Sequence, residues 1–147
     1  MESAESRQRL FWDSITCTLQ NPVFSIGPGQ FPTYEGRPEN RGTGIYWKNP
    51  HNSFMQVGSE CGIPALLLYL AGIGSTMGLF KNTGRHTSVR PDLDEITSAM
   101  FCMRLAMVGF CSATFFLNFS YLFYLPAMAG LAIAAKSASQ ELLCREP

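Results

Sequence analysis

The sequence predicts an all-α membrane protein, in which an amphipathic helix and a long extracytoplasmic loop precede about three transmembrane helices. Residues 63–80 contain no charged side chain, and residues 96–118 and 119–135 are again apolar, with Arg104 as their one charge. An uncharged run of about 18 residues is close to the minimum that a helix needs to cross a hydrocarbon core of about 30 Å. The polar part before these runs is rich in glycine and proline, which is typical of a loop.

The first element predicted is a short amphipathic helix over residues 4–20. Its apolar side chains, among them Leu10, Phe11 and Ile15, recur at roughly helical spacing. Asn21-Pro22 ends this helix, because the residue before a proline is disfavoured in the helical region. Residues 23–49 contain too many glycines and prolines for a long regular element. Residues 51–60 then predict a helical turn or two, capped by Asn49 or Asn52.

The apolar runs predict three membrane helices, over about residues 62–80, 97–118 and 120–136. Pro64 lies in the first turn of the first helix, where its missing N–H does no harm. A single helix over the last two runs would be about 60 Å long, twice the thickness of the membrane. We therefore expect two helices and a tight turn near Asn118 and Ser120. Residues 1–60 are predicted to form the loop segment, and residues 61–147 the transmembrane region with a cytoplasmic tail.

The basic residues predict the orientation. The connector between the first two membrane helices is short and carries Lys81, Arg85 and Arg90, which favours the cytoplasmic side. This orientation places the loop around His51 outside and the C-terminus inside. Basic residues within the first 50 positions lie on the predicted outer side, so they partly offset the excess of basic residues on the cytoplasmic side.

Composition excludes several classes of function. The formal net charge is zero, so no basic field is available to bind nucleic acid. The five cysteines are odd in number and have no C-x-x-C spacing, which argues against a zinc site or a disulfide framework. The polar N-terminus is not followed by an apolar core of signal-peptide type, so we expect internal segments to direct insertion.

The residues whose side chains suit catalysis or ligand binding lie mainly in the polar segment. His51 stands just before the first membrane helix, and a histidine at this depth can accept a proton from a sugar hydroxyl. Three arginines offer the planar, positively charged fork that suits diphosphate oxygens. The turn Gly27-Pro28-Gly29 lets the backbone approach a ligand closely. The three arginines that could bind diphosphate are Arg9, Arg37 and Arg41.

Each of these residues also has an ordinary structural explanation. A histidine at a helix start is more often a cap or a surface residue, and loop glycines usually serve turns. Glu60 is able to cap or pair near the interface, and arginines often contact lipid phosphate. A charge within a membrane run is rare and often functional, but Arg104 is long enough to reach the headgroups. The residues alone therefore favour an anionic or lipid-linked substrate only weakly.

Two linked motifs carry a more specific signal. They are Asn21-Pro22-Val23-Phe24-Ser25-Ile26-Gly27-Pro28-Gly29-Gln30-Phe31, and Pro50-His51-Asn52-Ser53-Phe54-Met55-Gln56-Val57 with Glu60-Cys61-Gly62-Ile63-Pro64. In order and approximate spacing, residues 7–80 resemble the O-antigen ligase and polymerase superfamily.

The resemblance implies a metal-independent glycosyltransferase of the bacterial inner membrane, with no cofactor. It would take glycan from an undecaprenyl-diphosphate carrier on the periplasmic face and pass it to a lipid or glycan acceptor such as lipid A core. The resemblance implies that His51 acts as a base or binds the donor, and that Arg9 neutralises diphosphate charge. The predicted site comprises catalytic His51 and Arg9 and, as substrate-binding residues, Arg37, Arg41, Gly27, Gly29, Asn52 and Glu60.

The chain departs from this family in its number of membrane helices, because family members have many more. We therefore expect it to correspond to the C-terminal portion of such an enzyme, with a missing N-terminal membrane partner. Two alternatives stay open: a non-catalytic subunit or inactive remnant that packs through Gly72, Gly74 and Gly78, and a small transporter or channel component that depends on Arg104. Ligation, polymerisation and protein glycosylation also remain open.

Overall fold

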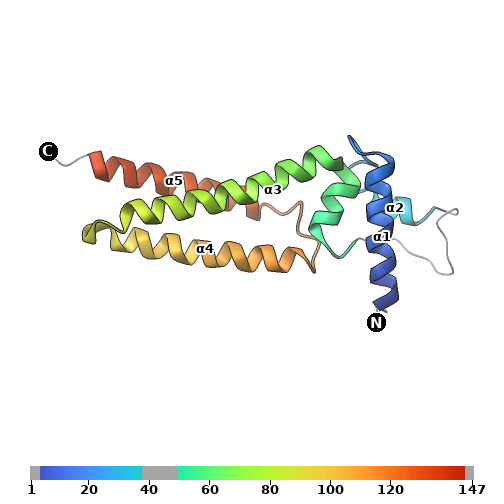
Figure 1. Ribbon diagram of the computed structural model, residues 1–147, viewed down its shortest axis with the longest axis horizontal. Helices are drawn as coiled ribbons and strands as arrows, with labels where there is room; N and C mark the ends of the chain where they lie inside the picture. Colours follow the sequence, from blue (N-terminus) through green and yellow to red (C-terminus); the bar gives the residue numbers. More distant parts are fainter. Residues whose placement is uncertain (1–3, 38–49, 145–147) are drawn as a thin grey trace. The chain divides into compact units, whose positions relative to one another are not determined.

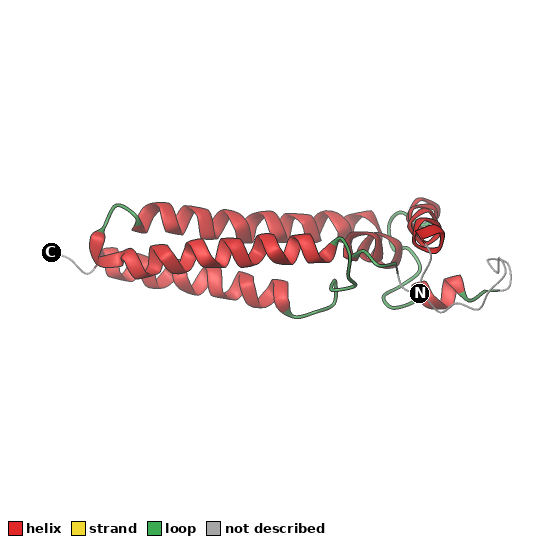
Figure 2. Cartoon of the chain, turned by 90° about the horizontal axis from the view of Figure 1, so that it is seen from below, coloured by secondary structure: helices red, strands yellow, loops and turns green. Residues whose placement is uncertain are grey.

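The computed structural model describes residues 4–37 and 50–144, and this part of the chain is helical, with turns and no strand. The predicted all-α class is thereby confirmed. In chain order the elements are α1 (Ala4–Gln20), α2 (Phe31–Glu35), α3 (Ser53–Thr87), a short 3-10 turn (Pro91–Leu93), α4 (Asp94–Thr114) and α5 (Tyr124–Cys144) (Figure 1, Figure 2).

The helices form two compact units. The N-terminal unit comprises the chain up to Tyr69 together with residues 113–121, and the bundle unit comprises residues 70–112 and 122–147. The boundary between these compact units falls inside α3, and the division into a loop segment over residues 1–60 and a transmembrane region over residues 61–147 stays a prediction. Residues 113–121 join the N-terminal unit because they pack against the first turns of α3, as described below.

The bundle unit consists of the C-terminal part of α3, α4 and α5, which run side by side (Figure 1, Figure 2). The ring of Phe110 stacks on that of Tyr124 with centroids 4.4 Å apart, which joins α4 to α5. The Thr97 hydroxyl donates to the Thr87 hydroxyl at 2.7 Å, which joins α4 to the end of α3. The turn between α3 and α4 lies at the same end of this unit as the C-terminal end of α5.

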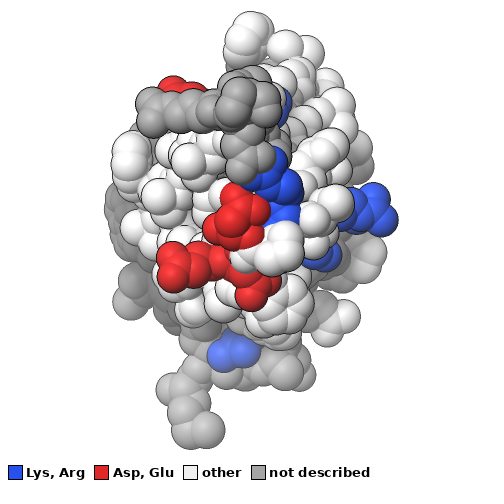
Figure 3. All heavy atoms as spheres, turned by 90° about the vertical axis from the view of Figure 1, so that its left-hand side faces the viewer, with Lys and Arg blue, Asp and Glu red and all other residues white. Residues whose placement is uncertain are grey.

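That end of the bundle unit is its charged face. Acidic and basic side chains lie next to one another on it (Figure 3). In the connector, the Arg90 guanidinium donates to both carboxylate oxygens of Asp92, at 3.1 and 3.0 Å. The predicted hydrophilic connector is therefore confirmed in character. The connector is shorter than expected, because α3 continues to Thr87. No proline lies between the end of the uncharged run at Phe80 and Pro91 to end the helix earlier.

Within residues 4–37 and 50–144, two helices are long and apolar enough to cross a membrane: α3, and the segment Pro91–Thr114 that contains α4. Only 11% and 17% of their most apolar stretches are buried within the protein. The core helix of a water-soluble protein would be mostly buried, whereas α4 exposes Phe101, Leu105 and Val108. An apolar face of this extent requires a covering that is itself apolar, so both helices have the character of membrane spans.

The third apolar run folds differently from the prediction. The end of the second run and the aromatic start of the third lie in an irregular connection over residues 115–123, and α5 begins only at Tyr124. Side chains of α3 hold this connection: Ser53 Oγ donates to Leu117 O at 2.6 Å and accepts from Phe119 N at 2.8 Å. Ser120 Oγ donates to Gln56 Oε1 at 2.6 Å. These bonds replace some of those that a helix would make, and the connection is longer than the predicted tight turn.

Candidate functional site

A kink at Gly62 interrupts α3 and organises the N-terminal unit. Gly62 has φ 84° and ψ 177°, which is far from helical geometry. The Ile63 N–H donates to the Pro22 carbonyl at 2.8 Å instead of bonding within the helix. Pro64 has no N–H to donate. The carbonyls of Ser59 and Glu60 thus lose their helical partners and become available to other parts of the chain.

The turn that follows α1 satisfies these carbonyls. The Gly27 N–H donates to the Glu60 carbonyl at 2.9 Å. The Ser25 hydroxyl and the Cys17 thiol both donate to the Ser59 carbonyl. The N-P-x-x-S-x-G-P-G motif and the E-C-G-I-P motif therefore hold each other in place. This contact is the physical reason why the two motifs occur together.

The Glu60 carboxylate completes the turn. It is fully buried and accepts hydrogen bonds from Gly29 N at 3.0 Å, from Phe31 N at 3.2 Å and from the Tyr121 hydroxyl. Burial and this hydrogen bond raise the pKa of Tyr121 above its ordinary value. Both glycines of the turn have positive φ, +100° at Gly27 and +72° at Gly29, which side chains disfavour. Glu60, Gly27 and Gly29 thus shape this turn; none of them lines the groove that contains His51, and their contact with substrate stays a prediction.

A groove of about 250 Å³ lies beside His51. His51 is exposed at its edge, and Asn52 follows it. The Asn52 side-chain oxygen accepts from Phe54 N at 2.9 Å and Met55 N at 3.2 Å, so Asn52 caps α3 as predicted. The remaining lining comes from α1, from α3 and from the connection before α5: Arg7, Leu10, Phe11, Pro50, Met55, Phe115 and Phe116.

The predicted arginines lie in different places. Arg9 does not line the groove; its guanidinium faces Asp13 at 3.4 Å and Glu35 at 3.8 Å. Arg37 lies over the Tyr34 ring, 5.6 Å from its centroid. Arg41 lies outside the described residues. The basic side chain that shares the groove with His51 is Arg7, which the sequence reasoning missed. Its spacing from Leu10 and Phe11 put it on their face of α1, and that signal could have identified it.

The carboxyl group next to Arg9 is unusual. Glu35, at the end of α2, is 5% exposed. Burial, and secondly the negative charge of Asp13, raise the pKa of Glu35 to about 7, while Arg9 lowers it. The α1–α2 contact therefore contains a carboxyl group that titrates near neutral pH, and Arg9 belongs to this contact.

One comparison with family models found a match. Residues 2–70, just under half of the chain, match the model described as O-antigen ligase. This matched stretch is called the O-antigen ligase segment below. The chain has no significant match among curated proteins or among solved structures.

The O-antigen ligase segment contains both linked motifs, the Gly62 kink and every residue that lines the His51 groove except Phe115 and Phe116. This match and the apolar helices α3 and α4 together indicate a membrane protein similar to O-antigen ligases. In the described part of the O-antigen ligase segment and the helices after it, no three His, Cys, Asp or Glu side chains are placed to hold a metal ion. The expectation of chemistry without a metal stays a prediction.

Proposed function

We propose that the chain provides the acceptor-activating side of a glycosyltransferase site on the periplasmic face of the bacterial inner membrane. The donor is glycan on an undecaprenyl-diphosphate carrier, and the acceptor is a hydroxyl group on a lipid or glycan such as lipid A core. One observation carries the proposal: the groove brings the imidazole of His51 together with the Arg7 guanidinium at the start of an apolar helix. A base and a fixed cation are the two groups that this transfer needs.

The reaction divides between the two side chains. His51 accepts the proton of the acceptor hydroxyl as that oxygen bonds to the anomeric carbon of the donor glycan. The bond between this carbon and the phosphate oxygen breaks, and the diphosphate leaves with the electron pair. Arg7 stabilises the negative charge of the leaving group. The aromatic wall of Phe11, Phe115 and Phe116 offers an apolar surface to the lipid carrier or a sugar face.

Replacement of His51 tests this assignment. In a strain that lacks the native gene, the wild-type chain restores polymer attachment to the envelope acceptor, and His51→Ala abolishes it. The glycan profile is read by gel electrophoresis of membrane extracts. Gln8→Ala is the matched control, because Gln8 is exposed on α1 next to Arg7 but does not line the groove. Unchanged polymer on the acceptor with His51→Ala, at equal protein level in the membrane, rejects the catalytic role.

The alternative function is that of a non-catalytic subunit of such an enzyme. One observation favours it: within the described residues, Arg7 is the one guanidinium that lines the groove, whereas a diphosphate carries two phosphoryl groups. A further membrane polypeptide would then supply the other cations of the donor site. Purification of the tagged chain from native membranes in mild detergent tests this. A stoichiometric membrane partner, with activity only in the complex, supports the subunit; activity of the chain alone rejects it.

A further inference from the structure

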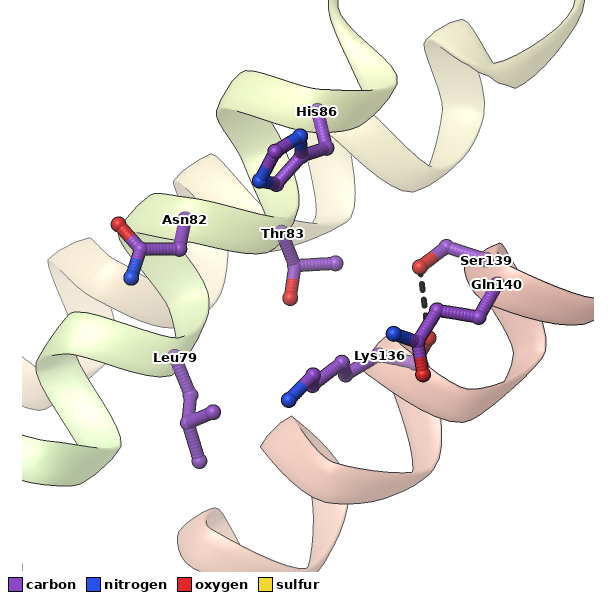
Figure 4. Close-up of a pocket in the computed structure, with 7 residues that line it drawn as sticks. All are labelled: Leu79, Asn82, Thr83, His86, Lys136, Ser139 and Gln140. Atoms are coloured by element: carbon purple, nitrogen blue, oxygen red, sulfur yellow. Dashed lines mark hydrogen bonds between the residues drawn. The ribbon is translucent and has the colours of Figure 1, made fainter. Parts of the chain in front are cut away.

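A second groove lies in the bundle unit, between α3 and α5 (Figure 4). Its volume is about 290 Å³. Its walls are formed by about two turns of α3 and little more than one turn of α5, with the residues Leu79, Asn82, Thr83, His86, Lys136, Ser139 and Gln140. None of these residues belongs to the His51 groove, so the second groove is a separate feature.

The groove lies at the level where both helices leave apolar sequence. The uncharged run of α3 ends at Phe80, and Lys81 follows it. On α5, Lys136 is the first charged residue after an uncharged run that began before the helix. Leu79 lies on the apolar side of this level, and His86 lies on the polar side. The surface of a membrane protein changes from apolar to polar in this way at the depth of the lipid headgroups.

The lining supplies hydrogen-bond donors and one full positive charge. Lys136 and Thr83 extend into the space between the two helices (Figure 4). The Gln140 amide and the His86 ring lie around them, and Asn82 lines the groove on the α3 side. No acidic side chain is among the described residues that line the groove. One ammonium group with neutral donors around it matches the single negative charge and the free oxygens of a phosphodiester.

The polar floor of the groove is fixed by the helices. Thr83 and Ser139 are buried, and the Ser139 hydroxyl donates to the Lys136 carbonyl at 2.8 Å. Lys136 itself is exposed, so its ammonium group reaches a ligand without losing an internal contact of the bundle. A site with a set floor and one accessible cation binds a headgroup at lower entropic cost than a fully mobile surface lysine.

We propose that this groove binds the phosphate group of an anionic membrane lipid, in the leaflet that the C-terminal end of α5 faces. Lys136 pairs with the phosphate, and Asn82 and Gln140 donate to its free oxygens or to the headgroup. The acyl chains then leave along the apolar side marked by Leu79. The proposal does not depend on glycan transfer; it requires only that α3 and α5 end at one membrane surface.

Native mass spectrometry of the purified full-length chain in detergent tests the proposal. The probes are phosphatidylglycerol, phosphatidylcholine and inorganic phosphate. We expect one phosphatidylglycerol to bind in preference to phosphatidylcholine, and Lys136→Gln to weaken that binding about fivefold. Lys81→Gln is the matched control. It removes one positive charge from α3, just after the uncharged run of that helix ends, but Lys81 does not line the groove. Binding in this control should equal that of the wild-type chain.

Three results would overturn the proposal. Equal binding by Lys136→Gln and wild type excludes the groove as the site. Equal loss in Lys136→Gln and Lys81→Gln shows attraction by general surface charge. Binding of inorganic phosphate that displaces the lipid at equal concentration shows a site for the free ion. Far-ultraviolet circular dichroism of each variant ensures that a loss of binding is compared between folded chains.

Discussion

Gly62 is the residue on which the geometry of the O-antigen ligase segment depends most. A Cβ atom at this position would lie 2.4 Å from the Val23 carbonyl oxygen and 2.8 Å from that of Pro22. Both atoms belong to the backbone of the turn and cannot rotate away. The positive φ of Gly62 adds a second reason why no side chain fits there.

We predict that Gly62→Ala lowers the free energy of unfolding of the N-terminal unit by about 2 kcal/mol or more, because it adds a backbone clash to a strained φ. Thermal unfolding in detergent, followed by tryptophan fluorescence in a chain with Trp47→Phe so that Trp12 on α1 is the reporter, measures the loss. Gly74→Ala is the control, since a Cβ at Gly74 meets nothing within 4 Å. It should leave the midpoint unchanged or raise it slightly. Equal midpoints for the two variants would contradict the proposed role of the kink.

Glu35 gives the N-terminal unit a dependence on pH. Its folded-state pKa is raised to about 7, above the value of 4.5 that applies in the unfolded chain. The folded state therefore binds the proton more tightly, and the associated stability is fully present below about pH 4.5. It is lost as pH rises towards and through 7. Unfolding midpoints measured from pH 5 to pH 8 should fall with pH in the wild-type chain.

Replacement of Glu35 isolates this effect. Glu35→Gln cannot ionise, so its midpoints should fall less steeply between pH 5 and pH 8, and above pH 7 it should be at least as stable as wild type. Glu141→Gln serves as the control, because Glu141 is exposed on α5 and should leave the slope unchanged. The same slope in Glu35→Gln and wild type would show that another group titrates.

Single residues were predictable from the sequence to different degrees. His51 and Asn52 are neighbours in the chain at the start of an evident helix, so their common position follows from local sequence. Arg7 replaces Arg9 in the groove because two residues along a helix turn the side chain by about 200°, to nearly the opposite face. The direction in which α1 packs sets this angle, and that direction depends on contacts with Ser59, 42 residues after Cys17. Local sequence does not contain this information.

At the scale of the element, α3 contributes both to the groove and to the contacts that hold the N-terminal unit together. Its first residues are capped by Asn52 and border the groove, and its Gln56, Ser59 and Glu60 hold two other segments of the chain. An effect of Asn52 on activity could therefore come from the cap or from contact with substrate. The two contributions are separable, because a serine caps a helix nearly as well as an asparagine but is shorter.

We predict that Asn52→Ala lowers the free energy of unfolding by about 1 kcal/mol, and that Asn52→Ser retains most of this stability. Denaturant titration in detergent measures both values. If Asn52 also binds substrate, glycan attachment falls in both variants, whereas a purely structural role leaves Asn52→Ser active. A loss of stability in Asn52→Ser equal to that in Asn52→Ala would contradict the capping role.

The elements show why some predictions succeeded. The uncharged run after residue 62 is long enough to specify a helix by itself, and α1 follows from its own periodicity. The connection over residues 115–123 was predicted to be largely helical because it is apolar. Its bonds to Ser53 and Gln56 join residues about 64 positions apart, and such long-range partners override local preference.

At the scale of the whole molecule, the number of membrane crossings is the property that matters most. α3 and α4 have the length and apolar character of spans, whereas the apolar run of the third segment is divided between the irregular connection and α5. In the bundle unit α5 runs beside the other two helices (Figure 1). We propose that the third segment also crosses, with the apolar connection and the part of α5 before Lys136 together passing through the hydrocarbon core and the part from Lys136 onwards at the surface.

The parity of the crossings gives this proposal a sharp test. With three crossings, the C-terminus lies opposite His51, in the cytoplasm; with two, it lies on the same side as His51. We predict that green fluorescent protein fused after the last residue is fluorescent and that alkaline phosphatase fused there is inactive, since each folds on one side of the inner membrane only.

Fusions after Ser88, in the α3–α4 turn, should behave in the same way, because the turn and the C-terminal end of α5 share one end of the bundle unit. Fusions after Leu117 should give the opposite pattern, with active phosphatase. An active phosphatase at the C-terminus, together with an inactive one after Ser88, would limit the chain to two crossings and remove the membrane surface that the α3–α5 groove requires.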